Sequence, residues 1–433
     1  MKKLTLVATA IMGLLSTSAA MAQSTVTVYG ILDAGYNHVS GLRQGSVSTI
    51  ASGIMEGSRF GLRGSEDIGG GYKAIFTLEN RFELDTGSVT NRPNSGTQMP
   101  DRVATSVAAS VIASGLPLPA ANRNALIAGV NTNLATSAFG VNLAGNLFDR
   151  QAYVGLVTPF GAFTAGRQYT PGYLVAAQFD ASQTQSSLAA GQVASLPAAF
   201  DIRLSNTLQY AIQTGGITAL LMYGAGEVPG NSSAGSFMGG MITYKTDAFS
   251  VGYGHNEKKN ELNQKSLTND LIGATVNVGP GTLYGQYATI KDDNPSGLAT
   301  IGAGVSAQVL AGGAPAALAA AAGTSFQNAY NAAFRQDATL MHIGYRLTTG
   351  VHTWVVAYNR LDDKRAVNAD TDSYGFTYTY ALSKRTNLNA VVTRFNNKGA
   401  GQVAPGGNGF LGGVTSAAGV SSTNIAFGIR HTF

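Results

Sequence analysis

The chain ends with the stretch SSTNIAFGIRHTF, residues 421–433, in which apolar and polar side chains alternate. One face carries Ile425, Phe427, Ile429, His431 and Phe433, and the other carries Ala426, Gly428, Arg430 and Thr432. A period of two is typical of a β-strand with one apolar and one polar face. A strand of this kind that stops on an aromatic residue indicates the closing strand of a β-barrel.

The opposite end of the chain has the layout of a secretory signal. Lys2 and Lys3 precede a mostly apolar run over residues 4–15, and Ala20-Met21-Ala22 forms a small-x-small cleavage site. The apolar run is short for a spanning helix, although an uncleaved membrane anchor is the alternative interpretation. We therefore expect residues 1–22 to be removed and the mature chain to begin at Gln23.

Composition excludes several classes of protein. The net charge of +5 falls to +3 once the two lysines of the expected signal are removed, and a nucleic-acid partner requires a denser basic face. The absence of cysteine excludes disulfides and thiolate metal sites. Mean hydropathy is +0.07, which is compatible with a membrane barrel because its apolar band is spread over alternate residues.

Alternation recurs along the chain, over residues 25–36, 58–65 and 72–83. In the last of these, apolar residues such as Phe76 and Leu78 oppose Thr77 and Glu79. The polar faces carry charged and hydroxyl groups, and aromatic residues lie toward the ends of the apolar faces. This combination predicts lipid outside the barrel and water inside it.

The connections alternate between short turns and long polar stretches. Seven short turns contain Gly, Pro, Asp or Thr, and eight long stretches separate them. The long stretches are residues 38–57, 84–147, 170–202, 227–235, 257–267, 292–335, 361–371 and 396–420. This predicts an all-β, antiparallel transmembrane barrel of about sixteen strands that fills residues 23–433 as one domain. The loops near 84–147 and 292–335 are unusually long, and the Ala-rich run 312–323 is expected to form a short helix.

Several motifs carry a family resemblance. Residues 28–35 (VYGILDAG), 58–71 (SRFGLRGSEDIGGG), 150–156 (RQAYVGL) and 160–169 (FGAFTAGRQY), with the terminal Phe, resemble the general porins of Gram-negative bacteria. The resemblance is strongest to the trimeric porins of β-proteobacteria and covers residues 23–433, with 84–147 as the main departure.

The resemblance implies a 16-stranded barrel, a homotrimer, and a third loop folded into the pore as a constriction. In this chain that loop is expected over residues 170–202. The family often has an acidic Pro-Glu-Phe-Gly type stretch there, whereas this chain reads SLPAAFD over residues 195–201. Asp180 and Asp201 are the acids that remain, so the usual field across the pore is in question.

The candidate pore-lining residues are charged. The basic candidates are Arg59, Arg63, Arg81, Arg150, Arg167 and Arg203, and the acidic candidates are Asp33, Glu79, Asp180 and Asp201. Alternation places Arg59, Arg63 and Arg81 on the inward face, but it places Arg150 and Arg167 on the outward face unless a bulge intervenes. The resemblance implies pore positions for Arg59 and Arg167 and, more loosely, for Arg203. The alternative for each arginine is a structural ion pair, such as one between Arg81 and Glu79 or Glu83.

The predicted function is passive diffusion of ions and small hydrophilic solutes across the Gram-negative outer membrane, with a preference for anions because basic candidates outnumber acids. The alternatives are a selective channel for small organic anions or sugars, and an adhesin that uses the long loops. No enzymatic activity, cofactor or metal is expected, since the five histidines are scattered and no nucleophile elbow is present. The expected partners are two further copies of the chain, outer-membrane lipid and lipopolysaccharide, and no nucleic acid.

Overall fold

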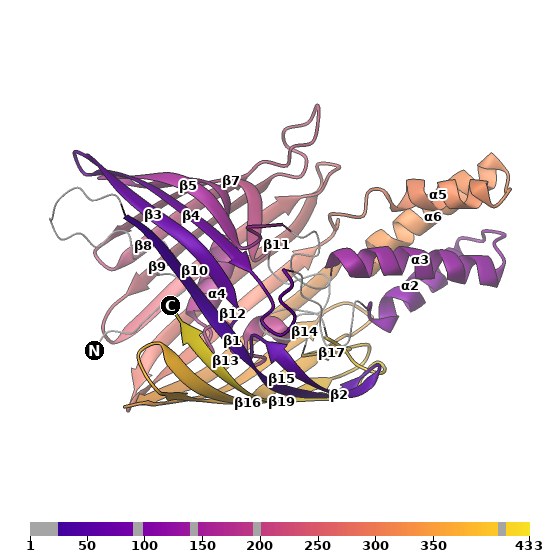
Figure 1. The fold of residues 1–433 in the computed structure, drawn as a ribbon. Helices are drawn as coiled ribbons and strands as arrows, with labels where there is room; N and C mark the ends of the chain where they lie inside the picture. Colours follow the sequence, from indigo (N-terminus) through magenta and orange to yellow (C-terminus); the bar gives the residue numbers. More distant parts are fainter. Residues whose placement is uncertain (1–24, 90–97, 139–145, 194–200, 406–412) are drawn as a thin grey trace.

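The fold is a closed antiparallel β-barrel with helices in its connections (Figure 1). The structure, a computed structural model, describes residues 25–89, 98–138, 146–193, 201–405 and 413–433. The expected signal lies outside these residues. Consecutive strands pair in chain order, and β19 returns to pair with β1. The wall strands are β1 (Thr25–Leu42), β2 (Gly45–Ser52), β3 (Arg59–Gly69), β4 (Tyr72–Arg81), β5 (Gln151–Thr158), β6 (Gly161–Tyr169), β7 (Arg203–Thr214), β8 (Ile217–Gly224), β9 (Phe237–Lys245), β10 (Phe249–Lys259), β11 (Lys265–Val278), β12 (Gly281–Asp292), β13 (Gln336–Thr349), β14 (His352–Asp363), β15 (Thr371–Ala381), β16 (Thr386–Asn397) and β19 (Ser422–Thr432).

One of the spanning strands is broken into two pieces. The sheet contains 17 segments among the described residues, but β2 and β3 pair with successive stretches of the same edge of β1. Ala34 pairs with Ser52 of β2, and Ile31 pairs with Arg59 of β3. Counted as one spanning strand, β2 and β3 bring the barrel to the sixteen strands expected from the sequence. The expected loop at 38–57 is corrected, because most of it is a paired strand and only Gly53–Ser58 leaves the wall.

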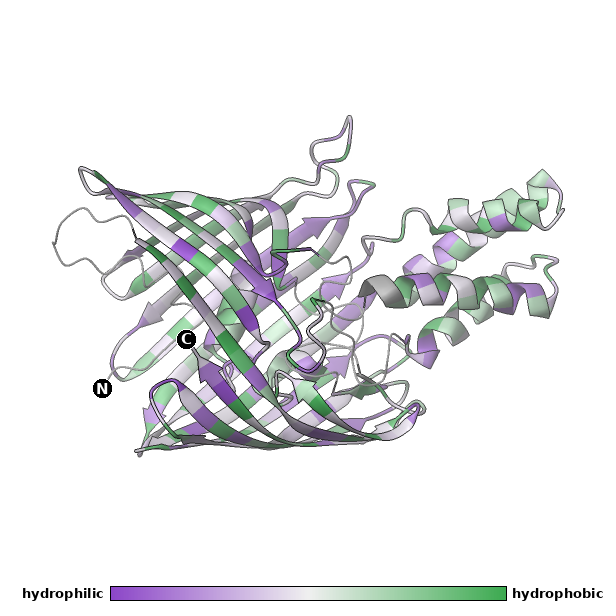
Figure 2. Ribbon diagram, viewed as in Figure 1, coloured by the Kyte–Doolittle hydropathy of each residue, from purple (hydrophilic) through white to green (hydrophobic). Residues whose placement is uncertain are grey.

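The two faces of the strands differ as the alternation predicts. On β5, Val154 and Leu156 are exposed on the outer surface, whereas Tyr153 and Val157 are buried inside. On β19, Phe427 is 55% exposed and its neighbour Ala426 is 2% exposed. Hydrophobic and hydrophilic positions alternate along the strands in Figure 2. An exposed apolar outer surface is the arrangement expected of a barrel that is surrounded by lipid.

The helices lie in the connections between strands. They are α2 (Asp101–Ala113), α3 (Ala120–Ala138), α4 (Pro171–Gln178), α5 (Ile301–Ala311) and α6 (Ala316–Phe334), with a 3₁₀ turn at Ala190–Val193 and a small hairpin of β17 (Val403–Ala404) and β18 (Gly413–Val414). Over the part of the chain that is described, no helix has both the length and the hydropathy to cross a membrane.

Two loop predictions are corrected by these helices. The stretch 84–147, expected as an irregular loop, contains α2 and α3. The helix expected over 312–323 instead begins at Ala316, after Pro315, and continues to Phe334. Gly313 has a φ of +82° in the turn before it, which favours glycine. Alanine has the highest helix propensity, so the Ala-rich composition propagates the helix well past the predicted end.

The connection between β6 and β7 folds inside the barrel. Its helix α4 packs against β9, β10 and β11, and the Phe179 side chain after it is fully buried. Gly252 of β10 and Gly273 of β11 lie beneath this ring, and a Cβ at Gly273 would approach Phe179 Cγ to 2.3 Å. Glycines on the inner wall therefore make the room in which the third loop is seated.

Candidate channel lining

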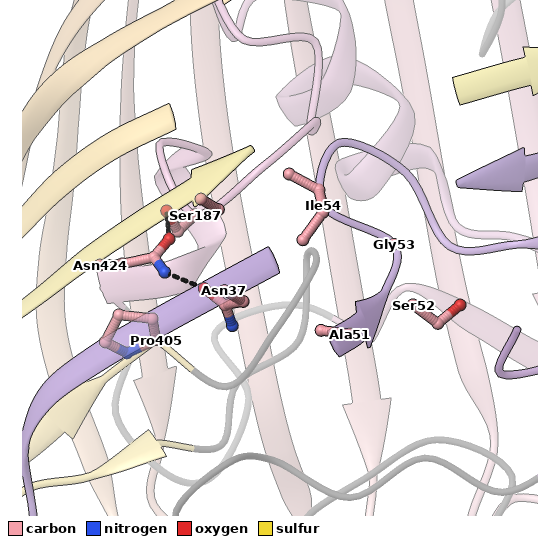
Figure 3. A pocket seen from close by; sticks show the side chains of 9 residues that line it. Asn37, Ala51, Ser52, Gly53, Ile54, Ser187, Pro405 and Asn424 are labelled. Carbon is pink, nitrogen blue, oxygen red and sulfur yellow. Dashed lines mark hydrogen bonds between the residues drawn. The ribbon is translucent and has the colours of Figure 1, made fainter. Parts of the chain in front are cut away.

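Asp33 on β1 binds the segment that interrupts the second spanning strand, between β2 and β3. Its carboxylate is completely buried and accepts hydrogen bonds from the backbone N–H groups of Ile54, Met55 and Glu56 at 2.9, 3.0 and 2.8 Å. These donors would otherwise lack partners, because Gly53–Ser58 has left the sheet. Figure 3 shows this segment beside a small pocket lined by Asn37, Ser187 and Asn424, among others. The structure thus gives Asp33 a role in the wall of the barrel, in place of the expected position facing permeating ions.

Glu56 projects from the inward segment between two arginines. Its carboxylate oxygens lie 3.3 Å from Arg59 Nη2 on β3 and 2.5 Å from Arg430 Nη1 on β19. The side chains of Arg59 and Arg430 are 15% and 14% exposed. One carboxylate compensates two guanidinium groups here, so the group keeps a positive excess.

Glu79 is the second carboxylate in this region. It accepts hydrogen bonds from Tyr29 Oη at 3.1 Å and from Arg150 Nε at 2.6 Å. Arg150 lies just before β5, which begins at Gln151, so the alternation of that strand does not set the direction of its side chain. Since Arg150 also donates to Tyr169 Oη at 2.8 Å, Glu79 is linked to the start of the third loop.

Tyr169 holds a second arginine beside Arg150. Arg203 Nη2 donates to the same Tyr169 hydroxyl at 2.9 Å, and the Arg203 guanidinium lies 4.4 Å from the centre of the Tyr169 ring. A cation over an aromatic face is attracted by the ring quadrupole. The Tyr169 hydroxyl thus holds Arg150 and Arg203 side by side, with Glu79 bound to Arg150 alone of the two.

These groups form one inward-facing set, which we call the arginine cluster: Arg59, Arg150, Arg203 and Arg430 with Glu56 and Glu79. Arg59 and Glu79 lie on the same face of β3 and β4, because Arg59 pairs with Arg81 and Gly61 pairs with Glu79. Glu56 joins Arg59 to Arg430, and the Tyr169 hydroxyl joins Arg150 to Arg203. Asp33, which pairs in register with Arg430, adds a third carboxylate beside the cluster. Four guanidinium groups against these three carboxylates leave an excess of one positive charge.

Two further arginines of the sequence prediction take different environments. Arg63 faces inward on β3, is exposed, and lies 5.1 Å from the centre of the Tyr29 ring. Arg81 is 1% exposed, and its Nε lies 2.6 Å from Glu83 Oε1. Arg81 therefore forms a buried ion pair with Glu83, which is the alternative role predicted from the sequence.

Arg167 stands apart from the cluster. It pairs in register with Ala152, on the face of β5 and β6 opposite to the buried Gln168. Its guanidinium donates to the Asp149 carbonyl at 2.5 Å and to Ser205 Oγ at 3.1 Å. The pairing of β6 with β7 shifts register between Gly166 and Gln168, so a bulge of the kind expected lies at Arg167. The pore position implied by the resemblance stays a prediction.

The acids of the third loop are also engaged. Asp180 is 1% exposed and accepts hydrogen bonds from Ser182 N and Ala190 N, both at 2.8 Å, so it holds the loop in its own fold. Asp201 at the end of the loop lies 3.3 Å from Lys258 Nζ, with about a quarter of each side chain exposed. Asp180 therefore stabilises the loop by hydrogen bonds within it. Asp201 is partly exposed to water and forms an ion pair with Lys258.

The chain matches a known protein family over most of its length. The family profile described as Gram-negative porin matches residues 7–400 of the chain. The chain belongs to the Gram-negative porin family. As a member of that family, this porin is an outer-membrane channel and carries out no enzymatic reaction.

Relatives and solved structures extend over nearly the whole porin. Outer membrane porin protein 32 of Delftia acidovorans is 26% identical over 451 residues, covering 100% of both chains. The anion-selective porin from Comamonas acidovorans has a similar fold, with a TM-score of 0.65 at 22% identity over 95% of this chain and 100% of that one. The in-vitro folded OmpT of Vibrio cholerae, in a trimer form, gives a TM-score of 0.53 at 12% identity over 95% and 99% of the two chains.

Several residues of the porin lining were not among the sequence candidates. Arg430 lies on the polar face of the last strand, and it would have been found by pairing that strand with β1, where it meets Asp33. Glu56 was hidden in an expected loop. His342 was set aside as an isolated histidine, although its Nε2 lies 2.9 Å from the backbone nitrogen of Ala181 in the third loop. No local pattern around His342 signals this contact.

Proposed function

We propose that this porin is a diffusion channel with a preference for anions, and that the arginine cluster sets the preference. The observation that carries the proposal is one inward-facing set of four guanidinium groups, which outnumber the two carboxylates of the set and the buried Asp33 beside Arg430. Charged side chains that line a water-filled passage bias which ions enter by Coulomb attraction. Arginine remains charged at any working pH, so the bias is permanent.

Within this proposal the sequence candidates divide into three groups. Arg59, Arg63, Arg150 and Arg203 form the basic lining, and Glu79 and Asp201 are its acidic counterparts. Asp33, Arg81 and Asp180 stabilise the wall and the third loop through their buried contacts. Arg167, at the register shift between β6 and β7, forms the third group by itself. The similar fold of a porin named anion-selective agrees with the sign of the proposed preference.

The test is the reversal potential of the purified protein in a planar bilayer under a tenfold KCl gradient. Step-wise conductance with an anion-favouring potential is the expected result. A cation-favouring potential would show that loop carboxylates dominate the field and would contradict the proposal. A neutral potential would show that the cluster is compensated and would contradict it equally.

We further propose that the channel is a homotrimer embedded in outer-membrane lipid and lipopolysaccharide. The continuous apolar outer surface, with residues such as Val28, Leu221 and Ile272 more than 60% exposed, needs lipid or another subunit to cover it. A trimer form is known for the similar OmpT fold. Mass measurement of the detergent-solubilised protein, with the bound detergent subtracted, should give three copies, and a single copy would contradict the assignment.

A further inference from the structure

Two helical hairpins leave the barrel from opposite walls. The first, α2 and α3, lies in the connection between β4 and β5, and the second, α5 and α6, lies between β12 and β13. When β2 and β3 are counted as one spanning strand, these connections follow the third and the eleventh strands of sixteen. They are therefore half a circumference apart.

The two hairpins nevertheless pack together as one four-helix bundle, which extends from the loop end of the barrel (Figure 1). Val107 of α2, Val305 of α5 and Phe326 of α6 share a buried core and are at most 1% exposed. Tyr330 of α6 is completely buried and donates a hydrogen bond to the Ile127 carbonyl of α3 at 3.2 Å. Because the hairpins start on opposite walls, this contact bridges the end of the barrel.

The base of the bundle is tied to the rim. Asp101, at the start of α2, lies 2.6 Å from Arg43 Nη2 in the hairpin between β1 and β2. The same carboxylate accepts a hydrogen bond at 2.9 Å from Gln402 Nε2, which belongs to the connection between β16 and β19. Within the bundle, Ser325 Oγ in the middle of α6 donates to Ser114 Oγ at the end of α2, at 2.9 Å. The rim contacts hold the base of the bundle, and the contact between α2 and α6 joins the two hairpins.

The bundle carries very little charge. Residues 98–138 and 298–335 contain four charged side chains, which are Asp101, Arg102, Arg123 and Arg335. Asp101 is paired with Arg43, and Arg102 is 6% exposed. Arg123 and Arg335 are the two charges that remain, and two charges spread over four helices give a weak field. This contrasts with the arginine cluster inside the barrel and separates a steric effect at the mouth from a charge effect in the lumen.

We propose that the four-helix bundle is a fixed steric filter that bridges the mouth of the channel and limits the size of solutes admitted from the loop end. Any solute on that side passes beside the bundle before it reaches the arginine cluster. The filter acts in series with the lumen and is independent of the sign of the solute charge.

The first test uses uncharged sugars of increasing size in a liposome-swelling assay. A variant in which residues 101–138 and 299–334 are each replaced by a short Gly-Ser linker should show a several-fold higher ratio of trisaccharide to monosaccharide influx. Its reversal potential in a KCl gradient should equal that of the parent. An unchanged influx ratio would overturn the filter. A changed reversal potential with an unchanged ratio would also overturn it, because it would assign the bundle to charge selection.

The matched control is Arg123→Ala, which removes the one charge of α3 and leaves the helices in place. The sugar ratio should be unchanged in this variant. An altered ratio would contradict a purely steric action.

A second test keeps the bundle intact. The chain contains no cysteine, so Ser114→Cys with Ser325→Cys introduces one pair whose side-chain atoms already meet. The disulfide should form readily in the folded protein, and sugar influx should be equal before and after reduction. Failure to form the disulfide would overturn the packing of the bundle. Slower influx in the oxidised state would show that the bundle opens during transport and would overturn a fixed filter.

Discussion

The Nε2 atom of His342 on β13 accepts a hydrogen bond of 2.9 Å from the backbone N–H of Ala181 in the third loop. The other ring nitrogen, Nδ1, lies 2.6 Å from Asn359 Oδ1 on β14, so His342 is the neutral tautomer with its proton on Nδ1. The imidazole is completely buried between wall and loop. This contact fixes the position of the loop that crosses the lumen.

Replacing His342 with Phe should loosen the third loop. The substitution leaves the buried Ala181 N–H without an acceptor, at a cost of about 1–3 kcal/mol in the free energy of unfolding. Single-channel recordings should then show more frequent closures and a broader distribution of conductance. His352→Phe is the control, because His352 lies on the next strand and bonds to Tyr378 outside the lumen. Identical recordings from both variants would contradict an anchoring role for His342.

Replacing Asp33 with Ala should destabilise the barrel by an amount on the order of 3 kcal/mol, because three buried N–H donors lose a charged acceptor. The temperature at which the folded band on an SDS gel converts to the unfolded band should fall. The transition temperature of Asp33→Asn, which keeps one oxygen acceptor, should lie between those of the parent and of Asp33→Ala. Glu66→Ala on the exposed end of β3 is the control and should leave the transition within experimental error. A transition of Asp33→Ala that coincides with that of the parent would refute the stabilising role of the three hydrogen bonds to Asp33.

Replacing Arg203 with Glu should shift the reversal potential toward cations. The change removes one positive charge and places one carboxylate beside Tyr169, which lowers the net charge of the arginine cluster by two. Arg123→Glu makes the same change of charge on α3, away from the lumen, and should leave the reversal potential close to that of the parent. Equal shifts in the two variants would mean that the potential follows total charge and not the cluster.

Tyr169→Phe separates the two interactions that hold Arg203. The variant keeps the ring under the guanidinium but removes the hydroxyl that Arg150 and Arg203 share. We expect a partial loss of anion preference in the reversal potential, and a larger loss in Tyr169→Leu, which removes both interactions. An unchanged preference in Tyr169→Leu would show that the aromatic residue does not position these cations.

Gly273→Ala should disturb the third loop through Phe179, since the new Cβ would lie 2.3 Å from Phe179 Cγ. Overpacking of this kind costs about 1–3 kcal/mol of stability. Phe179→Ala in the same chain removes the ring atoms at 2.3 and 2.4 Å but keeps Phe179 Cβ at 2.6 Å, so it should relieve the clash in part. The double variant should still be more stable than additivity predicts. Gly285→Ala on the next strand is the control, because the nearest atom to its Cβ is 3.9 Å away. Strict additivity would contradict the seating of the loop on these glycines.

The sequence predicted the barrel because its signal is local and repeated. Apolar and polar residues alternate in segments such as residues 72–83 and 425–433 because one face of each strand meets lipid. The pattern can be recognised in each strand without knowledge of its neighbours. The number of strands followed from counting turns. The predicted strand boundaries were wrong at residues 38–57, which were expected to form a loop. Paired strands that extend beyond the lipid also carry polar residues on both faces, so their ends resemble loops in sequence.

The chain by itself therefore determined the fold class, the strand count and the inward face of Arg59, Arg63 and Arg81. Only the tertiary structure decided which charges meet. Glu56 reaches Arg430 across 374 positions, and His342 reaches Ala181 across 161. Such contacts depend on closure of the barrel and on the path of loops inside it, which no local period encodes. For the same reason the sequence indicated two long stretches, 84–147 and 292–335, and a helix in the second, but it did not indicate that they pack together. The two helical hairpins form one bundle because closure of the barrel brings opposite walls into a single ring.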